Sequence, residues 1–126
     1  MDRSLPTEAQ EQLALIQWMN IKNIEYFAVP NGGSRHKLEA INLKRQGVKA
    51  GVSDMVVLLE NKILFVELKR RKKLLKSGKL STSHTSTSQA QTDFISKVSE
   101  YPYAQGKVCY GWEEAKEFIQ SHKALK

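Results

Sequence analysis

The chain has 126 residues, of which 40% are hydrophobic and 26% charged, a composition that fits one soluble globular domain over residues 1–126 and not a disordered chain. Its 20 lysines and arginines exceed its 13 acidic residues, and the net charge of +7 favours a polyanion partner such as nucleic acid. No apolar run approaches the ~20 residues that span a bilayer, and Met1–Gln10 lacks a signal-peptide core, so we expect a cytoplasmic protein without a membrane partner. Cys109 is the single cysteine, which excludes an intrachain disulfide and a cysteine-based zinc site.

The positive charge is concentrated in the middle of the chain. The segment from Arg35 to Lys79 contains 13 basic and four acidic residues, so it carries +9 while the rest of the chain carries −2. Seven of the basic residues lie between Lys69 and Lys79, and Ser81–Ser88 that follows is serine and threonine except for one histidine. We expect a basic, Ser/Thr-rich surface loop at about 70–88, which either contacts the polyanion or is simply a solvated face.

Helical and extended patterns alternate in the first half of the chain. Thr7 and Gln10 form a capping-box pattern before an apolar stripe, which predicts a helix over Glu8–Asn20. A strand is predicted over Glu25–Val29, followed by turn residues. Ser34 then begins a second predicted helix that extends through residue 46 and ends at a glycine.

Two apolar runs, Met55–Leu59 and Lys62–Lys69, follow with Glu60 and Asn61 between them. Both runs are apolar on both faces, as is typical of central strands covered by helices. A second capping box, Ser88 with Gln91, predicts another helix. The last predicted elements are a strand at 107–110 and an amphipathic helix at 112–122. The expected fold is α/β, a mixed sheet of about four strands flanked by helices in the order α-β-α-β-β-α-β-α.

Asp54, Glu67 and Lys69 are the chemically informative residues. If residues 60 and 61 form a two-residue turn, paired positions sum to 121, so Asp54 lies opposite Glu67. Lys69 points the same way because side chains alternate along a strand. Two adjacent carboxylates repel unless a cation lies between them, and Mg²⁺ or Mn²⁺ prefers such oxygen ligands. The alternative is structural, with Asp54 beginning a strand after a turn and Glu67 pairing with Lys69 or a neighbouring arginine.

The surroundings of these residues resemble a known family. The stretches that carry the resemblance are Glu8 and Gln12 of the first helix, Asn31-Gly32, Lys44 to Asp54 with the most specific part from Arg45 onward, Val66-Glu67-Leu68-Lys69, and Ser88 with Gln91. Together they resemble the VRR-NUC family of virus-type replication and repair nucleases, in the PD-(D/E)xK nuclease superfamily. The resemblance covers nearly the whole chain and is close to compact, stand-alone members, many of them encoded by phages.

The resemblance implies a restriction-endonuclease-like core and a set of roles. It implies that Asp54 and Glu67 bind the metal, with the Leu68 carbonyl as a further ligand, and that Lys69 is the catalytic lysine. It also assigns Glu8 to the metal or its waters, with Glu11 one turn away as the competitor. Gln91 matches the family glutamine, and Gln89 remains open as its competitor. A polar insertion after Lys69 departs from the family pattern.

The implied activity is Mg²⁺- or Mn²⁺-dependent hydrolysis of phosphodiester bonds in branched DNA, such as Holliday junctions, by a homodimer in the cytoplasm of a bacterial or phage-infected host cell, with a role in DNA repair. No small-molecule cofactor is expected. Eight basic residues are candidate phosphate contacts: Arg35, Lys44, Arg45, Lys49, Arg70, Arg71, Lys72 and Lys73. The alternatives are a non-catalytic basic nucleic-acid-binding module and a restriction-type duplex endonuclease.

Overall fold

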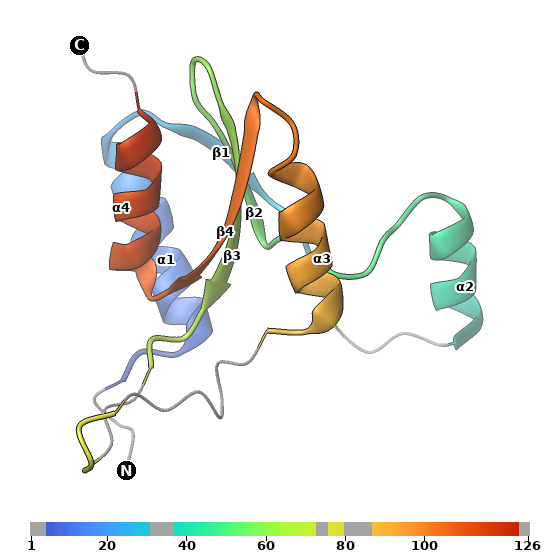
Figure 1. Ribbon diagram of the computed structural model, residues 1–126, viewed down its shortest axis with the longest axis horizontal. Coiled ribbons are helices and arrows are strands. Elements are labelled where there is room, and N and C mark those ends of the chain that lie inside the picture. Colours follow the sequence, from blue (N-terminus) through green and yellow to red (C-terminus); the bar gives the residue numbers. More distant parts are fainter. Residues whose placement is uncertain (1–4, 31–36, 73–75, 80–86, 124–126) are drawn as a thin grey trace.

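Four strands form one mixed sheet in the computed structural model of the chain (Figure 1), which describes residues 5–30, 37–72, 76–79 and 87–123, without side chains for 37–40. The strand order is β1-β2-β3-β4, with β3 and β4 parallel and the other two neighbouring pairs antiparallel. The elements are α1 (Glu8–Ile21), β1 (Glu25–Ala28), α2 (Lys37–Arg45), β2 (Met55–Leu58), β3 (Ile63–Lys69), α3 (Gln89–Val98), β4 (Ala104–Tyr110) and α4 (Trp112–His122). The predicted α/β class and element order are therefore confirmed.

The hairpin of β2 and β3 has the predicted register. Met55 pairs with Val66 and Leu58 with Ile63, so paired positions sum to 121. The Leu59 amide donates to the Lys62 carbonyl at 2.9 Å, which closes the loop over two residues. The next pair in this register beyond Met55 and Val66 is Asp54 with Glu67, at the end of the sheet where β3 finishes.

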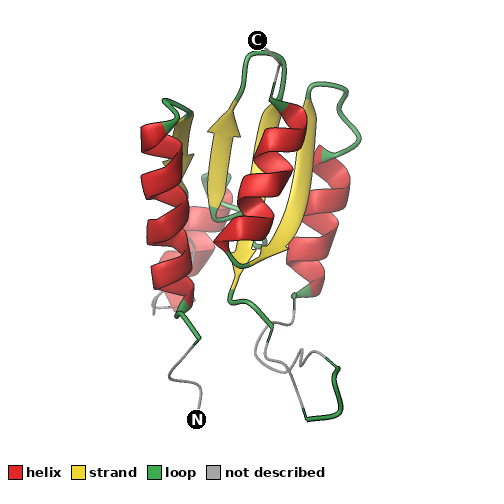
Figure 2. Cartoon of the chain, turned by 90° about the vertical axis from the view of Figure 1, so that its left-hand side faces the viewer, coloured by secondary structure: helices red, strands yellow, loops and turns green. Residues whose placement is uncertain are grey.

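Helices cover the two faces of the sheet unequally. Helices α1 and α4 lie on one face and α3 on the other, as Figure 1 shows, and Figure 2 turns the α1 and α4 side toward the viewer. The main hydrophobic core lies between α1, α4 and the sheet, with residues such as Leu15, Met19, Val66 and Ile119 fully buried. The α3 face has a smaller contact, in which the rings of Phe65 and Phe94 meet edge to face at 5.5 Å.

Both predicted capping boxes form, which fixes where α1 and α3 begin. At α1 the Gln10 amide donates to Thr7 Oγ1 at 3.1 Å, and the Thr7 amide donates to Gln10 Oε1 at 2.8 Å. At α3, Ser88 and Gln91 make the same reciprocal pair. These contacts satisfy amide groups that the first turn of a helix otherwise leaves without partners.

Some element bounds differ from the prediction. Strand β4 begins at Ala104 rather than at 107, because its first residues pair with β3 from Ile63 onward although Gln105 and Gly106 have low strand propensity. The predicted cap Ser34 lies outside the described residues, and so do residues 73–75 and 80–86 of the loop predicted at about 70–88. None of the described helices combines the length and apolar character needed to cross a membrane.

Candidate active site

The end of β3 is where several elements converge. In Figure 1 the end of β3 and the beginnings of α1, α3 and α4 all lie toward the lower end of the sheet. Glu67 and Lys69 belong to the last residues of β3, Glu8 opens α1 and Gln91 is in the first turn of α3. The fold thus brings together residues that are up to 83 positions apart in the sequence.

Asp54 and Glu67 face one another across the end of the hairpin. Oδ2 of Asp54 accepts a hydrogen bond from the Leu68 amide at 2.9 Å, which fixes the aspartate beside β3. The Glu67 side chain is only 3% exposed. Its Oε1 atom is buried without a hydrogen-bond partner among the described residues. Burying an ionised carboxylate is costly when one of its oxygens has no hydrogen-bond partner. Either a proton or a cation therefore belongs between Asp54 and Glu67.

The pKa of Glu67 reflects its burial next to a second carboxylate. Burial, followed by the negative charge of Asp54 and the hydrogen bond with Asp54 that the protonated group can make, raises the pKa of Glu67 to about 8 from its ordinary 4.5, with Glu8 adding to the rise and Lys69 opposing it. The pKa of Glu8 is also raised, first by burial and then by Asp54, and Lys69 again opposes the shift. Three carboxyl groups and one ammonium therefore influence one another at this end of the sheet.

Lys69 and Gln91 both approach the same oxygen of Glu67. Lys69 Nζ lies 3.6 Å from Glu67 Oε2, and the lysine side chain is 14% exposed. Gln91 Nε2 donates to Glu67 Oε2 at 3.0 Å, while Gln91 Oε1 accepts from the Ser88 amide at 3.0 Å. Gln91 therefore caps α3 and contacts the carboxylate pair at once. Its competitor Gln89 instead donates to Asp93 at 2.8 Å.

Glu8 and Glu11 are one turn apart on α1 but have different surroundings. Glu8 is exposed and lies within electrostatic reach of Asp54, Lys69 and Glu67. The Glu11 side chain is 0% exposed and pairs with Arg71. The structure therefore groups Glu8, and not Glu11, with the carboxylate pair.

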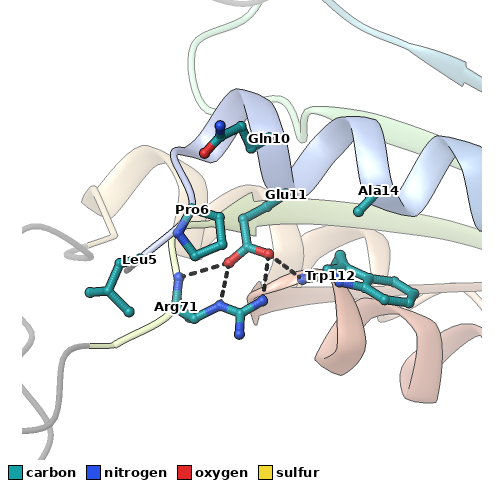
Figure 3. Close-up of a pocket in the computed structure, with 7 residues that line it drawn as sticks. All are labelled: Leu5, Pro6, Gln10, Glu11, Ala14, Arg71 and Trp112. Carbon is teal, nitrogen blue, oxygen red and sulfur yellow. Dashed lines mark hydrogen bonds and ion pairs between the residues drawn. The ribbon is translucent and has the colours of Figure 1, made fainter. Parts of the chain in front are cut away.

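Glu11 is enclosed by donors, as Figure 3 shows. Arg71 Nε donates to its Oε2 at 2.9 Å and Arg71 Nη2 to its Oε1 at 3.0 Å, and the amides of Arg71 and Trp112 add bonds of 3.4 and 3.3 Å. Burial by itself raises the pKa of Glu11, but these bonds and the charge of Arg71 outweigh it and the pKa is lowered. A cavity of about 360 Å³ borders the pair, lined by Leu5, Pro6, Gln10, Glu11, Ala14, Arg71 and Trp112.

Gly51 sets how closely the loop before β2 approaches α3. Its φ is +82°, and a Cβ atom added there would overlap the Ala90 carbonyl and lie 2.8 Å from the Gln91 amide nitrogen. Only a glycine fits this contact, because the conformation and the space both exclude a side chain. The contact brings the segment that ends in Asp54 against the turn of α3 that carries Gln91.

The residues at the end of β3 fit a divalent cation in part through side chains and in part through the backbone. Within the described ranges, no three Asp, Glu, His or Cys side chains are grouped tightly enough to hold a metal ion by themselves. The two opposed carboxylates, the unpartnered Glu67 Oε1 and the Leu68 carbonyl are oxygen donors of the kind that Mg²⁺ and Mn²⁺ accept.

The candidate phosphate contacts fall into two groups. Lys44, Arg45 and Lys49 are exposed, in or just after α2, which Figure 1 shows standing apart from the sheet. By contrast, three basic residues after β3 make internal contacts. Arg70 bonds to carbonyls before α1, Arg71 pairs with Glu11 and Glu113, and Lys72 lies 4.3 Å from the ring centroid of Tyr110. Arg35 and Lys73 lie outside the described residues.

The buried role of Glu11 was missed from the sequence, although a signal was present. Glu11 lies four residues before Leu15 and seven before Trp18, on the face of α1 that is buried. An acidic residue on an apolar helical stripe needs a buried basic partner. The sequence does not say which of the many basic residues that partner is.

Comparison with known proteins supports the fold. No protein-family model and no curated protein matches the sequence. A solved structure described as "VRR_NUC domain protein" superposes on the chain with a TM-score of 0.68 and 18% sequence identity, over 92% of this chain and 87% of that one. The expected fold is therefore confirmed: a mixed four-stranded sheet flanked by helices, as in a VRR_NUC domain protein.

Proposed function

We propose that the chain is a metal-dependent endonuclease that hydrolyses phosphodiester bonds in DNA. The observation that carries the proposal is the arrangement at the end of β3, where two opposed carboxylates, a lysine and a glutamine meet and where Glu67 Oε1 has no hydrogen-bond partner among the described residues. A purely structural carboxylate in so buried a position is normally satisfied by its neighbours. Resemblance to VRR-NUC nucleases and the shared fold support the same function.

Asp54, Glu67 and the Leu68 carbonyl would hold the cation, with Glu8 oriented toward it from the first turn of α1. A Mg²⁺ or Mn²⁺ ion bound there would supply neutralisation of phosphate charge and activation of the attacking water. Lys69 would orient that water or stabilise the charge that develops on the phosphate oxygens. Gln91 Nε2 donates to Glu67 Oε2 at 3.0 Å and so would orient this carboxylate.

The basic surface gives the protein a means to hold DNA. The exposed Lys44, Arg45 and Lys49 precede Asp54 in the chain and would contact the phosphate backbone of the bound DNA. Such contacts set affinity and salt dependence without reading base sequence. This favours recognition of DNA structure over recognition of a duplex sequence.

Branched DNA and a homodimer complete the proposal. Stand-alone members of the family that this chain resembles act on branched DNA such as Holliday junctions. Resolving a four-way junction requires two symmetric cuts, and a two-fold symmetric dimer places two identical sites to make them.

The test is a cleavage assay on labelled linear, flap and four-way-junction DNA with Mg²⁺, Mn²⁺ or EDTA. We expect cutting of the branched substrates with either metal and none in EDTA. Asp54→Asn and Lys69→Ala should abolish cleavage while DNA binding persists in a gel-shift assay. A second measurement follows thermal unfolding, in which Mn²⁺ should stabilise the wild type and not Asp54→Asn.

Three results would contradict the proposal. Binding of DNA by the wild type without cleavage in any metal would identify a non-catalytic nucleic-acid-binding module. Normal cleavage by both variants would remove the carboxylate pair and the lysine from catalysis. A monomer mass in solution scattering, at concentrations where junctions are cut, would eliminate the dimer alone.

A further inference from the structure

The segment that follows Lys69 is tied to the beginning of α1 by two arginines. Arg71 grips Glu11 with two parallel bonds of 2.9 and 3.0 Å, a geometry that only arginine offers to a carboxylate. Glu11 is fully buried while the Arg71 side chain is 33% exposed, so the carboxylate is shielded from solvent and the guanidinium only in part. Arg71 is therefore committed to an internal contact through both of these nitrogens.

Arg70 makes the second tie, to the backbone just before α1. Its Nε atom donates to the Pro6 carbonyl at 2.7 Å and its Nη2 atom to the Leu5 carbonyl at 3.1 Å. These carbonyls directly precede the turn that carries Glu8. Arg70 thus binds the backbone just before α1, and Arg71 binds a glutamate on the buried face of this helix.

A third contact fixes the backbone of Lys69 itself. The Gly111 amide donates to the Lys69 carbonyl at 2.9 Å, and Gly111 packs beside Glu11 and Arg71, with its ideal Cβ position 3.4 Å from Glu11 Oε2. The Trp112 amide donates to Glu11 from the next position in the chain. The end of β3, the start of α4 and the first turns of α1 are thereby joined around one buried carboxylate.

We propose that Glu11, Arg70 and Arg71 are positioning residues for the phosphodiester cleavage proposed above, on which this inference rests. They fix Lys69 on β3 and Glu8 on α1 relative to one another, although none of them touches the reacting phosphate. Displacing a reactive group by about 1 Å costs on the order of 100-fold in rate, so loosening the anchor should slow the chemical step. Arg70 and Arg71 are then not primarily DNA contacts.

Glu11→Gln and Arg71→Gln together distinguish positioning from DNA contact. The two substitutions change the local charge in opposite directions, so a DNA-contact role predicts weaker binding for Arg71→Gln and unchanged or tighter binding for Glu11→Gln. A positioning role predicts that both lower the single-turnover cleavage rate by about 10- to 100-fold and leave the DNA dissociation constant unchanged. The double variant should be no worse than the more damaged single one.

Glu113→Gln is the matched control. Glu113 contacts the same guanidinium at 2.8 Å, but its side chain is 58% exposed, so its removal should leave the cleavage rate unchanged. All rates are measured at a temperature at which circular dichroism shows each variant folded. If Glu11→Gln does not fold, Arg71→Lys replaces it, since lysine keeps the charge but loses the two-point contact. Its cleavage rate should fall without a change in affinity.

Two outcomes overturn the inference while the wild type still cuts DNA. One is a wild-type cleavage rate in folded variants with lowered melting temperatures, which indicates a structural role only. The other is a loss confined to binding, with the slope of log affinity against log salt reduced by about 1 in Arg71→Gln, which indicates a phosphate contact. If the wild type itself does not cut in any metal, the proposed function fails, and this inference fails with it.

Discussion

Two buried glutamates lie at the same end of the sheet and could hardly differ more in how they are satisfied. Both oxygens of Glu11 accept hydrogen bonds, and its pKa is lowered. One oxygen of Glu67 has no hydrogen-bond partner among the described residues, and the pKa of the Glu67 carboxyl group is raised to about 8. The first arrangement stabilises the folded chain. In the second, Glu67 and Asp54 repel each other when both are ionised, and a bound cation would reduce this repulsion. The difference separates a carboxylate that holds the fold from one that is available for chemistry.

The largest expected effect on stability comes from removing Glu11, the glutamate whose oxygens all have partners. Glu11→Ala leaves Arg71 partly buried without its main partner, and we expect a loss of about 3–5 kcal/mol in the free energy of unfolding. Glu8→Ala, one turn earlier and exposed, is the control and should change it by less than about 0.5 kcal/mol. Urea unfolding of both variants measures the difference. Equal losses would show that burial of Glu11 does not distinguish the two positions.

An intermediate effect is expected at Gly51, where the loop before Asp54 meets α3. Gly51→Ala combines a positive φ of +82° with overlap against the backbone of Ala90, and should cost about 2–4 kcal/mol and lower cleavage by displacing Gln91. The control is Gly47→Ala, whose φ is +97° but whose added Cβ has nothing within 4 Å. It should cost only about 1–2 kcal/mol. Thermal unfolding compares them, and equal costs would contradict the close contact.

The smallest expected effect on stability comes from the ionisation of Glu67 as the pH rises. Between pH 4.5 and about 8, folded metal-free protein keeps a proton on Glu67 that the unfolded chain has released. The contribution of Glu67 to stability is therefore full below pH 4.5 and is lost as pH rises through about 8. In EDTA, the wild type should lose melting temperature relative to Glu67→Gln across this window. If the melting temperatures of the wild type and of Glu67→Gln changed in the same way with pH, Glu67 would have an ordinary pKa.

Much of the site could be predicted because it depends on local pattern. The hairpin register followed from a two-residue turn and from strand periodicity. It predicted that Asp54 lies opposite Glu67, and in the structure these two carboxyl groups are close enough to influence each other. The capping box predicted where α3 begins and so placed Gln91 at its start. Their roles in catalysis and metal binding stay predictions that the cleavage assay tests.

Other parts could not be predicted, because they depend on contacts between distant segments. The pairing of Glu11 with Arg71 joins positions 60 residues apart, and no local pattern selects one arginine among so many. The first residues of β4, including Gly106, become a strand only because β3 lies beside them. The resemblance already favoured Glu8 over Glu11, but the burial of Glu11 became known only from the face of α1 that packs inward.

The sequence by itself determined the alternation of helices and strands, the register of the central hairpin and the presence of acidic residues within a segment of net charge +9. These features are local, since side-chain periodicity and turn chemistry act over a few residues. Only the tertiary structure decided which carboxylates are satisfied and which are not, because burial and partners come from α1, α3 and α4 closing on the end of β3. It also divided the basic residues into those exposed beside α2 and those that bind the protein's own backbone and carboxylates.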